Sequence, residues 1–304
     1  MPKNYLRFWG VRGSYPAPYA THMKIGGNTP CVELRLDDQI FLFDAGTGAI
    51  AFGQSLMSTS KGGHLNVFLT HYHWDHISGL PFFVPAFLPD YSIDFYGPAD
   101  SPCELEEHIA QQMRAPYFPV ETETWLARIR YHTPHYEPVS IGPARISAFV
   151  LHHPGLTYGY RIEVMGKVIL YCPDNEIFFV NQRIDSMREE FDEAEHELLE
   201  EMKEEQRGRV ADFMRDADIL IHDAQYTQSD YERKRGWGHS CYIDTVTSAI
   251  DADVKNLYLF SYDPNYDDVQ VDRLHADAQK LIVDRKAQTI CHKTVEGMII
   301  DLDD

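Results

Sequence analysis

The chain has 304 residues, of which 44% are hydrophobic and 24% charged, so it can bury the sizeable core of an ordinary globular protein. Its formal net charge is −20. Long polyanions are bound mainly by Lys and Arg that neutralise their phosphates, so this charge argues against long nucleic acid and leaves a small anionic substrate. No apolar run approaches the roughly 20 residues of a membrane helix, so we expect no membrane span.

The five cysteines are widely spaced, with no C-x-x-C pair. This pattern is typical of reduced thiols rather than of disulfides or a metal knuckle. The first residues also lack the apolar core of a signal peptide. We therefore expect a cytoplasmic protein.

Strand-like and helix-like segments alternate along the chain. The first half predicts strands at 5–9, 31–36, 40–44 and 65–70, and helices at 49–57, 104–114 and 121–129. The second half predicts strands at 145–151, 158–164, 167–171, 219–222 and 257–260, and helices at 243–251 and 268–284. Two β-rich halves with helices outside favour an α/β fold, an αββα sandwich. Because no linker or repeat interrupts it, we expect residues 1–304 to form a single domain.

An acidic helical insertion is predicted near 184–206. Its apolar residues recur at steps of three and four along one stripe, which indicates a surface helix packed on the body of the protein. The alternatives are a lid over the active site or a subunit contact in a homo-oligomer. The stripe consists of Met187, Phe191, Ala194, Leu198 and Met202.

Residues 70–76 read Thr-His-Tyr-His-Trp-Asp-His, directly after an apolar run. In an extended chain, side chains two positions apart point the same way, so His71 and His73 can hold one cation together. Asp75 and His76 follow where the chain must turn, and they can face a second cation. Imidazole and carboxylate ligands suit zinc, and also manganese or iron, so the motif predicts one or two such ions.

Two later strand ends carry further candidates. Leu-His-His-Pro-Gly at 151–155 offers His152 or His153 as a third ligand of the first ion, and we prefer His153. Tyr-Cys-Pro-Asp-Asn at 171–175 ends an apolar strand, where Asp174 can bridge two ions. Each residue alone fits an ordinary turn, but downstream of the first cluster they predict a complete metal centre. Three more residues can orient the ligands through hydrogen bonds: Asp44, His22 and Asn28.

These motifs resemble the metallo-β-lactamase superfamily, and more closely its phosphodiesterase branch, which includes tRNase Z and cyclic-nucleotide phosphodiesterase-like hydrolases. The resemblance covers nearly the whole chain, through the cluster at 70–76 and the segments at 8–14, 26–31, 43–48, 221–226 and 236–240. It implies an αββα sandwich of the metallo-β-lactamase type. It also implies two ligand sets: His71, His73 and His153 for the first ion, and Asp75, His76 and the bridging Asp174 for the second.

One position departs from the family pattern. The family usually places a last histidine ligand after a late strand, in a context such as Leu-Phe-His, where this chain has Ser261. A serine hydroxyl is a poor zinc ligand, so we expect the second site to be weaker, differently populated or empty. Tyr262 or water can fill the gap; His275 and His292 are further substitutes, although both are more simply surface residues.

The segment at 236–240 reads Gly-Trp-Gly-His-Ser. By the resemblance, a histidine in this context protonates the leaving oxygen and an acidic residue orients it, and His239 and Asp223 match those positions. Histidine can donate a proton near neutral pH when a carboxylate fixes its tautomer. These two residues and Asp75 are the expected catalytic group. Alternatively, His239 is only a loop residue at the start of a helix.

The sequence therefore predicts a metal-dependent hydrolase, a phosphodiesterase that acts on a small phosphodiester such as a cyclic nucleotide. The attacking group is expected to be a metal-bound hydroxide, because a bound cation lowers the pKa of water to near 7. One alternative hydrolyses a thioester or lactone with the same fold and metal, although those branches usually lack the segment at 236–240. Another is a degenerate, non-catalytic metal-binding regulatory protein, in keeping with the serine at 261.

Overall fold

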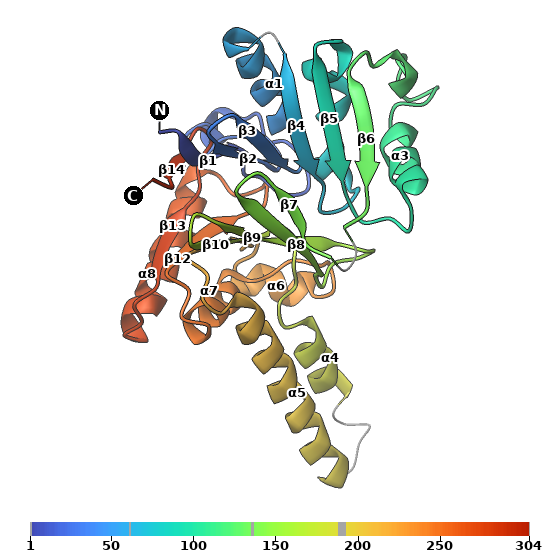
Figure 1. The fold of residues 1–304 in the computed structure, drawn as a ribbon. Helices are drawn as coiled ribbons and strands as arrows, with labels where there is room; N and C mark the ends of the chain where they lie inside the picture. The colour runs from blue at the N-terminus through green and yellow to red at the C-terminus, as the bar shows by residue number, and fades with distance from the viewer. Residues whose placement is uncertain (1, 61, 135–136, 188–192, 304) are drawn as a thin grey trace.

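Two mixed β-sheets of seven strands each pack face to face in the computed structural model, which describes residues 2–60, 62–134, 137–187 and 193–303. Helices cover the outer face of each sheet, with α1 and α3 on one side and α7 and α8 on the other (Figure 1). The predicted αββα sandwich is confirmed.

The first sheet has the order β14-β1-β2-β3-β4-β5-β6. Strands β3 to β6 run parallel, whereas β1 pairs antiparallel with β2 and β14. The strands are β1 (Asn4–Gly10), β2 (Cys31–Leu36), β3 (Gln39–Phe43), β4 (Gly63–Phe68), β5 (Tyr91–Tyr96), β6 (Arg128–His132) and β14 (Ile299–Asp301).

The second sheet has the order β13-β12-β11-β10-β9-β8-β7. Strands β10 to β13 run parallel, and β7 to β10 form an antiparallel meander. The strands are β7 (Val139–Ile141), β8 (Ala144–Val150), β9 (Tyr158–Val164), β10 (Lys167–Cys172), β11 (Ile219–Asp223), β12 (Asn256–Phe260) and β13 (Ile290–Lys293).

Eight α-helices are present in the described residues, and none of them is long and apolar enough to cross a membrane. They are α1 (Gly48–Thr59), α2 (Trp74–Ile77), α3 (Pro102–Gln111), α4 (Phe179–Met187), α5 (Glu193–Met214), α6 (Gln228–Lys234), α7 (Tyr242–Asp251) and α8 (Asp268–Asp284).

Aromatic rings join the two sheets across the central core. Phe43 of the first sheet lies 5.8 Å from Tyr160 and 5.7 Å from Tyr171 of the second, measured between ring centroids. Phe68 lies 5.3 Å from the same Tyr160 ring. Such pairs add to the free energy gained by burying the rings, so they fix the strand ends of the two sheets against each other.

The predicted helix at 121–129 is wrong. Residues Thr122–Thr124 form only a short 3-10 turn, and β6 begins at Arg128. Strand β6 pairs parallel with β5, and Arg130 donates two hydrogen bonds to Asp94 of that strand. Pairing with a neighbouring strand overrides a weak local helix pattern here.

The acidic segment predicted near 184–206 forms a helical hairpin of α4 and α5 that projects from the body (Figure 1). Part of its predicted apolar stripe, including Phe191, lies outside the described residues. Leu198 is 57% exposed and Met202 is 47% exposed, so the described part of the stripe does not pack on the body. The end of α5 does, because Met214 is buried in the core. The single domain with an acidic insertion stays a prediction.

Replacing both exposed residues with serine (Leu198→Ser with Met202→Ser) is expected to change the free energy of unfolding by less than about 0.5 kcal/mol, because neither side chain is buried. The matched control is Phe260→Ala in the core, which is expected to lose about 3–5 kcal/mol. Chemical denaturation measures both. A loss above about 2 kcal/mol in the double variant contradicts the exposed position of the stripe.

Candidate metal centre

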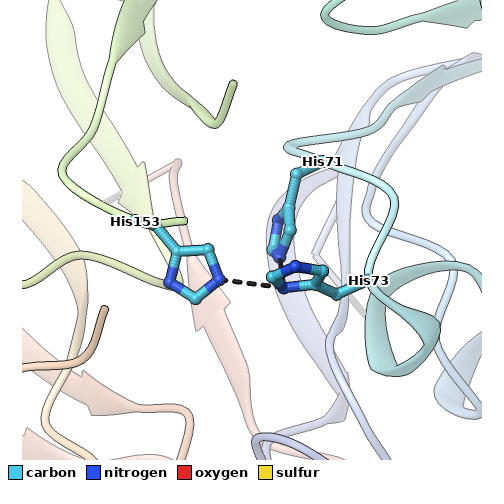
Figure 2. A group of neighbouring side chains, drawn as sticks. All are labelled: His71, His73 and His153. Carbon is cyan, nitrogen blue, oxygen red and sulfur yellow. Dashed lines mark hydrogen bonds between the residues drawn. The ribbon is translucent and has the colours of Figure 1, made fainter. Parts of the chain in front are cut away.

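Three imidazoles face one another where β4 and β8 end (Figure 2). His73 Nδ1 lies 2.9 Å from His71 Nε2 and 2.9 Å from His153 Nε2. The side chains of His71 and His153 are buried, whereas His73 is exposed. The three residues predicted for the first ion are therefore brought together.

The three nitrogens that face one another are His71 Nε2, His73 Nδ1 and His153 Nε2, and neutral rings do not supply enough protons for both hydrogen bonds between them. Thr70 Oγ1 donates its hydrogen to Asp44, so its 3.1 Å contact with His71 Nδ1 requires that nitrogen to donate. His153 Nδ1 donates to a backbone carbonyl at 2.8 Å. In neutral rings both Nε2 atoms then present lone pairs, and His73 Nδ1 has at most one proton for the two. A cation resolves this conflict, so the donor set fits a three-histidine zinc site.

The carbonyl behind His153 belongs to Gly238, which has a φ of +89°. A Cβ on this residue would stand 2.4 Å from His153 Nδ1, so only glycine allows this approach. Glu176 fixes the loop, since its carboxylate accepts hydrogen bonds of 2.9 Å from the backbone N–H groups of Gly236 and Gly238. Sequence reasoning missed Glu176; its position two residues after the predicted bridging aspartate was the available signal.

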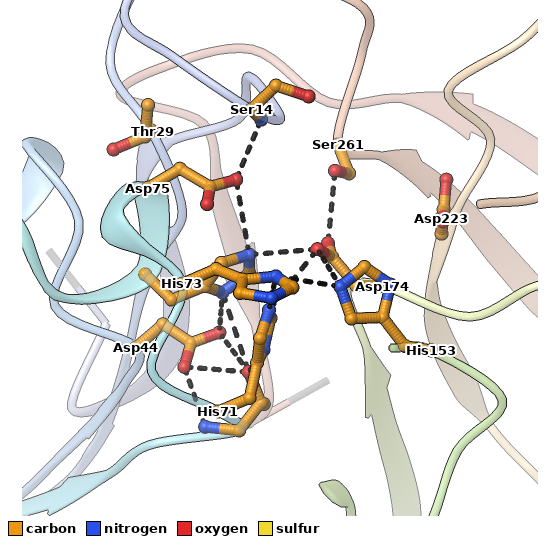
Figure 3. A network of polar contacts seen from close by, with 12 residues as sticks. Ser14, Thr29, Asp44, His71, His73, Asp75, His153, Asp174, Asp223 and Ser261 are labelled. Atoms are coloured by element: carbon orange, nitrogen blue, oxygen red, sulfur yellow. Dashed lines mark hydrogen bonds and ion pairs between the residues drawn. The ribbon is translucent and has the colours of Figure 1, made fainter. Parts of the chain in front are cut away.

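The residues predicted for the second ion also converge (Figure 3). His76 Nε2 lies 3.1 Å from Asp174 Oδ2 and 3.4 Å from Asp75 Oδ2. Asp174 Oδ2 is also 3.7 Å from Nε2 of both His71 and His153. One carboxylate oxygen therefore faces both groups of ligands, as a bridging residue requires.

Asp44 orients these ligands from behind. It is fully buried and accepts hydrogen bonds from His76 Nδ1 at 2.8 Å and from the Tyr171 hydroxyl at 2.9 Å. It also accepts the backbone N–H of Thr70 at 2.8 Å. A carboxylate in this position fixes the imidazole tautomer and aims the opposite nitrogen at a cation.

Ser261 stands at the end of β12, where the family pattern has a histidine. Its Oγ lies 3.3 Å from Asp174 Oδ1 and 3.3 Å from Gln225 Oε1, so the side chains of Gln225 and Ser261 meet beside the bridging carboxylate. Tyr262 does not replace the missing ligand, because its hydroxyl accepts the backbone N–H of Thr294. The second group therefore has one imidazole and a surplus of oxygen atoms.

Five other candidates make their hydrogen bonds outside the ligand group. Their side-chain partners lie in α5, in the loops at 264 and 296, in strands β12 and β13, and at Thr21 and Thr47. The residues are His22, Asn28, His152, His275 and His292.

His239 lies next to the ligand group, with its Nδ1 atom 2.9 Å from Asp223 Oδ2. One imidazole nitrogen of His239 lies within 4.8 Å of the ligand atoms of His153 and Asp174. The backbone N–H of Ser240 also donates to Asp223 Oδ2, at 3.3 Å, which holds the carboxylate in place. Although burial favours a neutral ring, Asp223 together with Asp174 and Asp75 raises the pKa of His239 to about 9, which favours the protonated ring that an acid needs.

The electrostatics divide the histidines into two classes. Burial lowers the pKa of His71 well below its usual value and that of His153 to about 4, so both rings are neutral and can offer lone pairs. Burial also lowers the pKa of His73. For His76, burial acts in the same direction, but Asp174 and other carboxylates raise its pKa well above the usual value. The second group thus attracts positive charge.

Comparison with known proteins identifies the family. Residues 39–262 match the family model of the Beta-lactamase superfamily domain. The chain belongs to this superfamily. Ribonuclease Z of Thermoplasma volcanium is 26% identical over 90% of this chain and 92% of its own length.

Two solved structures share the fold over nearly the whole chain. The metallo-beta-lactamase fold protein YhfI of Bacillus subtilis has a TM-score of 0.67 at 16% identity, covering 98% of this chain and 99% of its own. Unliganded yeast PDE1 has a TM-score of 0.64 at 16% identity, covering 99% and 100%. This member of the superfamily is a metal-dependent hydrolase whose fold implies a divalent metal.

We expect Ser261→His to increase the zinc that remains on the protein after dialysis from about one towards two ions per chain, because an imidazole replaces a weak hydroxyl ligand. Metal analysis by mass spectrometry measures the ratio. Thr227→His is the control, since Thr227 caps α6 away from the ligand group. Equal zinc content in the wild type and Ser261→His contradicts the view that the serine weakens the second site.

Proposed function

We propose that this hydrolase cleaves phosphodiester bonds. The observation that carries the proposal is the contact between His239 and Asp223, which places a carboxylate-paired imidazole beside the ligand group. Phosphodiester cleavage needs a proton for the departing alkoxide, and a carboxylate-oriented histidine is suited to provide it.

The residues support a two-cation arrangement. The first set would hold zinc through three imidazoles, and the second set would hold zinc, manganese or iron through one imidazole and carboxylates. When bound, such ions neutralise phosphate oxygens and make a water ligand more acidic. The sets are His71, His73 and His153 for the first ion, and Asp75, His76 and Asp174 for the second.

The protein side chains provide orientation and the proton. Asp223 accepts the Nδ1 proton of His239, which leaves Nε2 as the atom that gives a proton to the leaving oxygen. Asp75 accepts the backbone N–H of Ser14 at 2.7 Å, so its carboxylate is fixed at the edge of the second set. A pocket of about 210 Å³ next to His153 and Gly238 provides room for part of a substrate.

Two substrate classes are compatible with this chemistry. The net charge of −20 favours a small phosphodiester such as a cyclic nucleotide, because the chain offers few cations for a long polyanion. Relatives called ribonuclease Z match about 90% of the chain, which conflicts with excluding long nucleic acid and makes RNA a second candidate. A cytoplasmic location and a homo-oligomer stay predictions.

His239→Gln is expected to lower kcat for bis(p-nitrophenyl) phosphate about 10²- to 10⁴-fold, because it removes the proton donor. Asp223→Asn is expected to act in the same direction, since an amide does not hold the imidazole in its protonated form. Both variants are expected to keep the zinc content of the wild type. His275→Gln is the matched control, because His275 bonds Cys291 O away from the site. If the activity of His239→Gln equals that of the wild type, His239 is not the proton donor.

Parallel assays decide between the substrate classes. The full-length protein, supplied with Zn²⁺ or Mn²⁺, is tested with cyclic nucleotides, with a structured RNA transcript and with thioester and lactone substrates. We expect phosphodiester cleavage that disappears in His73→Ala and Asp174→Ala. Cleavage of cyclic nucleotides alone supports the small substrate, and cleavage of the transcript supports RNA. Turnover of only the thioester or lactone overturns the proposal.

A further inference from the structure

We infer that an aromatic pocket beside the metal centre binds a nucleobase of the substrate. The inference rests on the proposed phosphodiesterase activity and narrows it to nucleotide-containing phosphodiesters. The pocket measures about 680 Å³, within the range of roughly 300–1,000 Å³ common for small-molecule sites. Its walls come from α2, from the end of α3 and from the loop after α3.

Two strongly exposed aromatic rings border this pocket. Trp74 is 80% exposed and Tyr117 is 86% exposed. Large aromatic side chains usually lose most of their contact with water, so two such rings at one opening point to a ligand that covers them. Inside the pocket, the Tyr72 and His108 rings lie 4.6 Å apart and extend the aromatic wall.

Two residues that line the pocket, Ser78 and Gln112, each have a buried polar atom (Oγ and Nε2) without a hydrogen-bond partner in the described structure. A buried polar group without a partner costs about 1–3 kcal/mol, so such groups call for a ligand or another partner. A hydroxyl can donate or accept, and an amide N–H donates. Nucleobase edges present adjacent donors and acceptors, which complement this pair.

The pocket and the ligand group share helix α2. Helix α2 has Trp74 as its first residue, and the next two residues are the predicted ligands Asp75 and His76. Helix α2 therefore contributes residues to both sites, and Ser78 is its C-terminal cap. A base held against Trp74 would be attached, through its sugar, to a phosphate at the metal centre.

The described lining of the pocket suits an uncharged base. None of the described residues that line it is acidic, although the chain contains 47 Asp and Glu residues. The wall of the pocket instead carries the neutral amide side chains of Gln111 and Gln112. Aromatic stacking together with neutral hydrogen-bonding groups is the usual means of holding single-stranded nucleotides, with stacking worth about 1–3 kcal/mol per base.

Nucleosides contain the base but no phosphate, so their binding tests the pocket independently of phosphate binding at the metal centre. The probes are adenosine, guanosine, cytidine and uridine, added to the full-length, zinc-loaded protein and followed by ligand-detected NMR titration. We expect Trp74→Ala and Tyr117→Ala each to weaken binding at least about fivefold, and Trp74→Phe to restore most of it. Gln112→Leu is expected to change the order of affinities among the four nucleosides.

Tyr19→Ala is the matched control, because Tyr19 is an aromatic residue with 54% exposure that does not line the pocket. Nucleoside binding with these variant effects supports the pocket even when no phosphodiester is cleaved, in which case only the proposed function fails. Absence of nucleoside binding, or equal binding by Trp74→Ala and the wild type, overturns the inference. Dissociation of an oligomer by Trp74→Ala, seen by sedimentation, also overturns it, because a second copy of the chain would then cover the rings.

Discussion

The contact between His76 and Asp174 joins the two halves of the molecule at the site. His76 follows a strand of the first sheet, Asp174 follows a strand of the second, and both side chains are almost fully buried. A buried carboxylate is expensive unless positive charge is close by. The two sheets can therefore meet at this edge only with cationic groups between them, whether a protonated imidazole or metal ions.

The topology explains why so few segments can supply the whole site. Strands β3, β4, β10, β11 and β12 run parallel within their sheets, and each is followed at its carboxyl end by a residue of the centre. Since parallel strands end at the same edge, side chains far apart in sequence meet there. Glu176 and Gly238 then shape the loop that contacts His153 and carries the proposed proton donor, His239. The positions of the His153 and His239 rings thus depend on backbone atoms as well as on other side chains.

The surroundings of the centre distinguish this protein from a generic hydrolase of its superfamily. Ser261 and Gln225 bring oxygen atoms beside Asp174, at the position where the resemblance implies an imidazole. On another side, Trp74 and Tyr117 place exposed rings at the pocket that helix α2 lines. Gln206 of α5 contacts His152, the residue before the predicted ligand His153.

The sequence alone determined the fold class and predicted most of the residues that the structure brings together, because the spacing of His71 and His73 and the strand ends at 153 and 174 are local patterns. Only the tertiary structure decided between His152 and His153, since both follow the same strand and differ in what they face. The tertiary structure also excluded Tyr262 as a substitute ligand, because its hydroxyl already has a partner. It showed that residues 121–129 lead into strand β6 instead of forming a helix, and that Leu198 is exposed on the projecting hairpin. Each of these outcomes depends on a partner distant in the chain, which local periodicity does not encode.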